Sequence, residues 1–159
     1  MLNFKINTYL KIIFLISFIS IFSAFFIEHI LGHKPCNLCL KQRIPYGLSI
    51  ILIALNYFSK INEQFIVVLL ILTFSFSFII SFYHFGIEQG FFDESAVCGL
   101  KNSNEIISKE ELLKQLQNIA VSCKDVTFRI FGFSLTTFNM IISLIIIFLL
   151  IKNYEKFKK

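Results

Sequence analysis

The sequence predicts an all-α membrane protein, a four-helix transmembrane bundle, from its composition and from the spacing of its charges. Of the 159 residues, 56% are hydrophobic and only 16% are charged, and the mean hydropathy is +0.75. A soluble domain carries about 25% charged residues and at about 150 residues buries only about 70% of its unfolded surface. Lipid must therefore solvate much of the chain, which excludes a soluble enzyme, a disordered tail and a nucleic-acid-binding module.

Four uncharged stretches are long enough to cross a bilayer, which requires about 20 mostly apolar residues in a helix. They run over residues 12–27, 44–59, 64–87 and 130–151. Backbone groups inside hydrocarbon must be satisfied within the segment, and no barrel-like alternation occurs, so all four are expected to be helices. They form one domain over residues 1–159, with outward-facing loops at 28–43 and 88–129.

An even number of spans puts both termini on one side of the membrane. The terminal segments and the turn at residues 60–63 carry seven basic groups, which is typical of cytoplasmic segments. Lys34, Lys41 and Arg43 oppose this rule, but the basic density lies at the chain ends. The first span could instead be a signal peptide, although no convincing small-x-small cleavage site follows it.

The long loop contains one further predicted element, a short amphipathic helix. Ser108 and Glu111 form a capping box, and apolar residues follow at helical spacing up to Ala120. The helix would lie on the membrane surface or pack on the bundle, and the pattern does not separate the two.

All four cysteines fall in the outward loops, at Cys36, Cys39, Cys98 and Cys123. Cysteines that pack as small hydrophobes would be scattered through the spans, whereas paired cysteines in an oxidising compartment form disulfides. Four cysteines allow three pairings, which the spacing leaves open.

Cys36 and Cys39 form a Cys-x-x-Cys pair next to the second span, which favours redox chemistry. A thiolate is stabilised near a helix N-terminus or a cation, and Cys39 would have both the helix dipole and Arg43 one turn later. A structural disulfide remains an alternative.

A metal site is a further interpretation of the same loop. His29, His33, Cys36 and Cys39 have a spacing from which two histidines and two thiolates could bind zinc. This interpretation leaves the other two cysteines unexplained, so no metal is expected.

Three polar residues near or within the spans are candidates for function or for packing. Arg43 would either reach the headgroups or act as a fixed cation, and His84 lies near the outer end of the third span. Asn139, inside the fourth span, is expected to hydrogen-bond a neighbouring helix.

Several motifs together resemble the DsbB family of bacterial inner-membrane disulfide-generating proteins. They are PCNLCLKQRIPY at residues 35–46, YHFGIEQG at 83–90 ahead of Cys98, FRIFG at 128–132 after Cys123, and the stretch 134–139. With four spans and two outward loops, the resemblance covers nearly the whole chain.

The resemblance implies a membrane disulfide oxidoreductase of the bacterial inner membrane, with cytoplasmic termini. Such a protein reoxidises a periplasmic DsbA-like thiol oxidase of thioredoxin fold and passes the electrons to a membrane quinone, ubiquinone or menaquinone. A disulfide is transferred by thiolate attack, so the relay needs two pairs that can meet.

The resemblance also implies a role for each site residue. Cys98 and Cys123 match the pair that oxidises the partner, with Cys98 forming the mixed disulfide, and Cys36 and Cys39 match the membrane-proximal pair. Cys39 would meet the quinone as a thiolate.

Two further roles are implied beside the quinone. Arg43 would stabilise the charged state of the Cys39 thiolate with the quinone, and His84 would lie near the quinone ring. The chain has no Trp, where relatives commonly carry Trp near Phe91 and Phe92, at Phe128 and next to Asn139. Phe keeps the bulk but loses the indole donor, so any indole contact is in doubt.

Two other functions compete with this interpretation. One is a metal-binding or structural membrane protein whose disulfides act as staples. The other is a vitamin K epoxide reductase-like protein, which typically has its loop pair before a late Cys-x-x-Cys, the reverse of the order here.

Overall fold

Four long helices form the protein, in agreement with the predicted membrane bundle. The computed structural model describes residues 2–59, 62–93, 122–124, 129–130 and 132–158. The helices are α1 (Leu2–His29), α2 (Asn37–Ser59), α3 (Glu63–Glu88) and α5 (Leu135–Lys158). Each contains a segment that is long and apolar enough to span a membrane. The prediction of an all-α four-helix membrane protein is confirmed.

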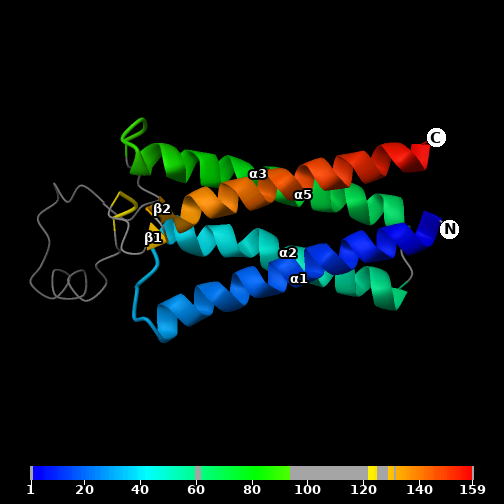
Figure 1. The fold of residues 1–159 in the computed structure, drawn as a ribbon, viewed down its shortest axis with the longest axis horizontal. Coiled ribbons are helices and arrows are strands. Elements are labelled where there is room, and N and C mark those ends of the chain that lie inside the picture. The colour runs from blue at the N-terminus through cyan, green and yellow to red at the C-terminus, as the bar shows by residue number, and fades with distance from the viewer. Residues whose placement is uncertain (1, 60–61, 94–121, 125–128, 131, 159) are drawn as a thin grey trace, which may run out of the picture.

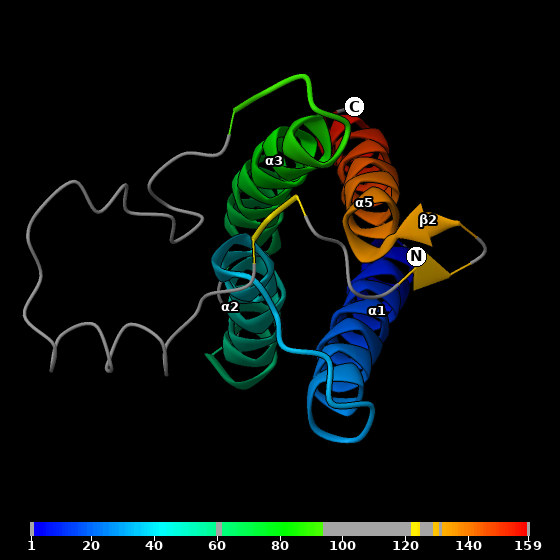
Figure 2. The same ribbon diagram turned by 90° about the vertical axis from the view of Figure 1, so that its left-hand side faces the viewer.

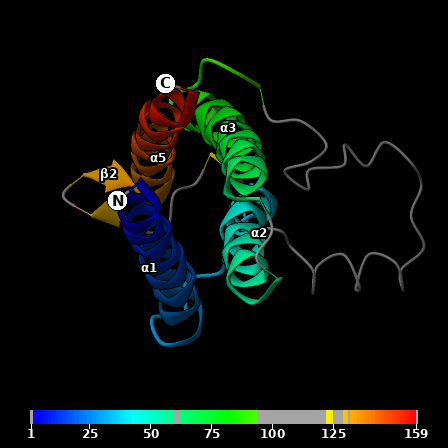
Figure 3. The ribbon, with the colours of Figure 1, turned by 90° about the vertical axis from the view of Figure 1, so that its right-hand side faces the viewer.

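The helices pack side by side, and the chain ends lie together at one end of the bundle (Figure 1). α3 packs against both α2 and α5, and α2 packs against α1. Seen from either end, the helices occupy four corners (Figures 2 and 3). The loop from α1 to α2 and a small β-hairpin lie at the end opposite the termini, and the candidate site is built there.

Large apolar side chains pack in one cluster in the interior of the bundle, and small polar side chains lie along the contacts between helices. The buried apolar cluster comprises Leu10, Ile13, Tyr46, Ile53, Ile66, Val67, Leu70, Phe74, Ile146 and Leu150. Large apolar residues such as Phe22 and Phe148, each 63% exposed, cover the outside. This surface suits lipid, which is as apolar as the core and so provides no hydrophobic force between helices.

Polar side chains therefore link the helices. Ser49 donates to Ser17 at 2.8 Å between α2 and α1. Asn139 of α5 donates to Ser81 of α3 at 2.7 Å and accepts from the Tyr46 hydroxyl of α2. The prediction that Asn139 bonds a neighbouring helix is confirmed, and it bonds two.

The N-terminal end of α2 differs from the expected span. The helix begins at Asn37, seven residues before the predicted start at residue 44. Charged side chains such as exposed Lys41 limit the lipid-facing segment but do not end a helix, since they can extend toward water. Consequently Cys39 and Arg43 belong to the first turns of α2 and not to a loop.

The fourth helix begins later than predicted, at Leu135 instead of residue 130. Arg129–Ile130 (β1) and Phe133–Ser134 (β2) pair as an antiparallel hairpin, in which Gly132 has a φ of +84°. A positive φ is uncommon for residues other than glycine, and it breaks the helical backbone here. Ser134 then caps α5 by accepting from the backbone N–H of Thr137 at 3.3 Å. The predicted amphipathic helix of the long loop and Cys98 lie outside the described residues.

Candidate active site

Cys36 occupies the N-cap position of α2. Its carbonyl oxygen accepts from the backbone N–H of Leu40 at 3.1 Å, and its Sγ accepts from the backbone N–H of Cys39 at 3.2 Å. This sulfur takes the position that a Ser or Asp oxygen usually takes at a helix start. The helix N-terminus, which the sequence argument assigned to Cys39, therefore acts most directly on Cys36.

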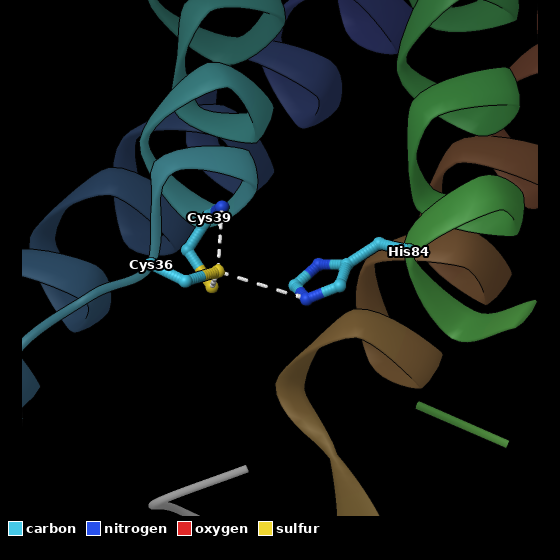
Figure 4. Close-up of side chains that lie close together, drawn as sticks. All are labelled: Cys36, Cys39 and His84. Atoms are coloured by element: carbon cyan, nitrogen blue, oxygen red, sulfur yellow. Dashed lines mark hydrogen bonds between the residues drawn. The ribbon is translucent and has the colours of Figure 1, made fainter. Parts of the chain in front are cut away.

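The two thiols and an imidazole form a compact group (Figure 4). Cys36 and Cys39 are both free, with their Sγ atoms 2.7 Å apart, and Cys36 Sγ lies 3.6 Å from His84 Nε2. The hydrogen bond from the Cys39 thiol, helped by His84, outweighs the effect of burial and lowers the pKa of Cys36 from 9.0 to about 4. Cys36 is thus the nucleophilic thiolate of the reduced pair.

His84 is buried, with 2% of its surface exposed, and its ring is held from both sides. Gln42 Nε2 donates to His84 Nδ1 at 3.0 Å, and Thr136 Oγ1 lies 3.1 Å from the same nitrogen. With Gln42 Nε2 as donor, Nδ1 accepts, which corresponds to the tautomer with its proton on Nε2, the nitrogen that faces Cys36. Gln42 and Thr136 are positioning residues that the sequence argument missed.

Glu88 is a third residue that was not predicted from the sequence. Its side chain is 4% exposed, and its Oε1 lies 3.7 Å from His84 Nε2, one helical turn away on α3. Its Oε2 accepts from Ser134 Oγ at 2.5 Å, which links the start of α5 to the site. The i, i+4 spacing of His84 and Glu88, at the outer end of the predicted third span, was the available signal.

Arg43 is paired with an acidic residue of another helix. Its Nη1 lies 2.5 Å from Glu28 Oε2, and its guanidinium carbon lies 5.3 Å from the ring centre of Phe25. The charge of Arg43 is therefore balanced by Glu28 of α1, and this pair holds the guanidinium at the site. From the sequence alone, Glu28 was predicted only to mark the end of the first span.

A cavity of about 380 Å³ opens beside the thiol pair. Its lining includes Cys36, Cys39, Arg43 and His84. The four residues that were predicted to form the membrane-proximal part of the site therefore line the same cavity. Apolar side chains of α1 and α5 continue the wall. The volume and the few converging polar groups are typical of a small-molecule site.

Cys123 lies against the same thiol pair. It is disulfide-bonded and 2% exposed, and it packs in one buried cluster with Cys36, Leu38 and Ile87. The structure thus brings a cysteine of the long loop to the Cys-x-x-Cys motif, although 87 positions separate Cys36 from Cys123 (123 − 36).

The group of residues that could bind a metal contains a different histidine from the two suggested by the sequence. His29 is exposed, with its Nδ1 3.2 Å from Phe25 O. Within the described residues, the group that could hold a metal consists of Cys36, Cys39 and His84, whose donor atoms lie within 4.8 Å of one another.

Comparison with known proteins agrees with this geometry. A family model described as "Disulfide bond formation protein DsbB" matches residues 7–152. The chain is 30% identical over 148 residues to "Uncharacterized protein RP370" of Rickettsia prowazekii (strain Madrid E), covering 91% of this chain and 86% of that protein. No solved structure matches significantly. The family match spans both the helices and the thiol pair, and the chain belongs to the DsbB family of disulfide bond formation proteins.

Proposed function

We propose that this protein is a membrane disulfide oxidoreductase that reoxidises a periplasmic DsbA-like thiol oxidase and passes the electrons to a membrane quinone. One observation carries the proposal: the free Cys36–Cys39 pair and the disulfide-bonded Cys123 pack together and line the same cavity. A relay of this kind needs one cysteine pair near a soluble partner and one pair near the final acceptor.

The first part of the relay joins the long loop to its partner. We propose that Cys98 and Cys123 form the loop disulfide and that a thiolate of the partner attacks Cys98. The partner's second thiol then resolves the mixed disulfide. The partner leaves with a disulfide, and the two loop cysteines hold the two electrons as thiols.

The second part regenerates the loop disulfide from the membrane-proximal pair. A thiolate of the loop attacks Cys36 Sγ of the oxidised pair, and Cys39 leaves with the electron pair of the broken bond. The second loop thiol resolves the new bond, so the loop disulfide re-forms and Cys36 and Cys39 become reduced. Packing of Cys123 in one buried cluster with Cys36 supports attack at that sulfur, and Cys39, which lines the cavity, is then the thiolate released beside the electron acceptor.

The residues around the cavity fit a quinone. Arg43, His84 and Asn139 offer donors to carbonyl oxygens, and isoleucines such as Ile27 and Ile142 offer an apolar wall. When bound, a quinone supplies an acceptor for two electrons and two protons. The protein's part is to hold Cys39 at the cavity and to place His84 Nε2 beside Cys36.

The orientation in the bacterial inner membrane is part of the proposal. The termini would be cytoplasmic, and the thiol pair would lie at the periplasmic face. The basic residues near the chain ends support this orientation, and the ends lie at the opposite end of the bundle from the hairpin (Figure 1).

A reconstituted assay tests the relay. Purified protein is mixed with a short-chain quinone and a reduced thioredoxin-fold oxidase, and quinone reduction is followed optically. Cys39→Ala is expected to abolish steady turnover, and Cys123→Ala is expected to accumulate a covalent complex with the partner through Cys98. Sustained turnover in Cys39→Ala would contradict the proposed electron path, and failure to trap the complex would contradict the assignment within the loop pair.

The role of Arg43 has a matched control on the same helix turn. Arg43→Gln removes the cation that lines the cavity, whereas Lys41→Gln removes a cation that is exposed. We expect Arg43→Gln to raise the apparent KM for quinone and to leave partner exchange intact, with Lys41→Gln close to the parent. An unchanged quinone KM in Arg43→Gln would remove this residue from the quinone site.

A further inference from the structure

Three donor atoms at the thiol pair have the chemistry and spacing of a zinc site. Cys36 Sγ, Cys39 Sγ and His84 Nε2 lie within 4.8 Å of one another, and the Cys36–His84 separation is 3.6 Å. Zn–S bonds of about 2.3 Å and Zn–N bonds of about 2.0 Å in a tetrahedron separate neighbouring ligands by about 3.5 to 3.8 Å. The separation of Cys36 Sγ and His84 Nε2 already fits, and the two sulfurs must separate by about 1 Å from their present 2.7 Å.

We propose that the reduced pair Cys36 and Cys39, together with His84, binds Zn²⁺ and is thereby withheld from disulfide exchange. Cys36, Cys39 and His84 all line the cavity, from which a water molecule would supply the fourth ligand. This site differs from the one that the spacing of His29 and His33 indicated, because its histidine comes from α3.

The surroundings of His84 suit a metal ligand. A histidine that binds metal through one nitrogen almost always donates its other N–H to a fixed acceptor. Thr136 Oγ1 lies 3.1 Å from His84 Nδ1 and can accept that hydrogen bond. Gln42, 3.0 Å from the same nitrogen, can accept it as well if its amide turns to present the oxygen.

Charge also favours a cation at this position. Glu88 has a 4% exposed side chain, and its Oε1 lies 3.7 Å from His84 Nε2. Because Cys36 is already a thiolate, Zn²⁺ binding releases the Cys39 thiol proton, leaves the ring proton of His84 on Nδ1, and transfers no electrons. Thiolate and imidazole ligands together select zinc over hard cations such as Mg²⁺.

Metal binding and the disulfide exclude each other, because an oxidised pair offers no thiolate. Zn²⁺ is therefore expected to bind only the reduced protein. It would stop the relay after the Cys36–Cys39 pair has been reduced and before its electrons leave. This inference goes beyond the proposed function and does not depend on the identity of the electron acceptor.

Cobalt titration of the full chain tests the site without quinone or partner. In a Cys98→Ala/Cys123→Ala background, only Cys36 and Cys39 remain as thiols. We expect the reduced protein to bind one Co²⁺ per chain with thiolate-to-cobalt charge-transfer and tetrahedral ligand-field absorption, which added Zn²⁺ removes. Oxidation of the same protein to the disulfide is expected to abolish both absorptions, a comparison that needs no substitution at the site.

Variants then identify the ligands. Cys36→Ser and Cys39→Ser are expected to lose the charge-transfer band, and Thr136→Val to weaken Co²⁺ binding about tenfold by removing the acceptor for His84. His29→Gln, at an exposed position, is the control and should bind as the parent does.

Two results would overturn the zinc site. One is a reduced protein without a thiolate-to-cobalt band, and the other is an unchanged band and affinity in His84→Gln. Neither result bears on quinone reduction. Conversely, a protein that binds Co²⁺ but reduces no quinone would contradict the proposed function alone.

Discussion

Removing the Cys39 thiol should raise the pKa of Cys36, because that thiol is the main cause of the low value. The structure gives Cys36 Sγ three neighbours: the Cys39 thiol at 2.7 Å, the Cys39 backbone N–H at 3.2 Å and His84 Nε2 at 3.6 Å. They lower the pKa of Cys36 from 9.0 to about 4. Cys39→Ala removes the first neighbour and leaves the other two.

The size of the change follows from the energy of one charge-assisted hydrogen bond. Such a bond contributes about 1.5 to 3 kcal/mol, and one pKa unit corresponds to about 1.4 kcal/mol. The pKa of Cys36 should therefore rise from about 4 to about 5 or 6 in Cys39→Ala. Cys39→Ser, which keeps a hydroxyl donor, should show a smaller rise.

The assay is the pH dependence of iodoacetamide alkylation in the Cys98→Ala/Cys123→Ala background. There Cys36 is the single thiol of the Cys39→Ala and Cys39→Ser variants, so the midpoint of the alkylation rate reports its pKa. A midpoint that stays near 4 in Cys39→Ala would refute the reasoning. It would mean that the helix N-terminus and His84 suffice to hold the thiolate.

Stability should follow the same titration. A thiolate with a lowered pKa stabilises the fold fully above the unfolded value of 9.0, and this contribution declines as the pH falls and is lost below about 4. The parent and Cys39→Ala should differ by a constant amount below about pH 4, and by a larger amount above about pH 6. Unfolding in detergent at pH 4 and pH 8 measures both differences.

Three substitutions test the packing around the site, each by the free energy of unfolding in detergent. Asn139→Leu leaves the Tyr46 hydroxyl without its acceptor and should cost about 0.6 to 1.7 kcal/mol; no loss would mean that this contact adds nothing. Gly86→Ala places a methyl group against the Phe92 ring and should cost about 1 kcal/mol. The same change in Phe92→Ala should be neutral or stabilising, and an equal cost in both backgrounds would exclude this clash. Ser134→Ala removes the cap of α5 and should cost about 0.5 to 2 kcal/mol, with Ser134→Asn closer to the parent.

The membrane spans were predictable because the requirement that produces them is local. A run of about 20 apolar residues specifies a helix in lipid without reference to the rest of the chain. Helix ends were less predictable, since Arg43 was read as the boundary of the second span although it lies inside α2. The hairpin before α5 was not predicted, because the stretch from residue 130 is uncharged throughout. The interruption comes from the backbone angle of Gly132 and not from a polar side chain.

The cysteines of the site could be named from the sequence, whereas the contacts that tune them could not. The Cys-x-x-Cys spacing places two sulfurs on one turn, and the family motifs identify Arg43 and His84. Neither indicates that Arg43 pairs with Glu28 or that His84 faces Cys36. These contacts join positions far apart in the chain.

The sequence by itself determined the solvent of this protein, its four spans, its family and its reactive residues, because hydrophobicity and motif spacing act over short distances along the chain. The tertiary structure decided which thiol caps α2, which nitrogen of His84 faces that thiol and which carboxylate balances Arg43. Those properties depend on the packing of α1, α2, α3 and α5 around one cavity. A side chain's charge state is set by what lies within a few ångströms of it in space, and only the folded bundle brings those groups together.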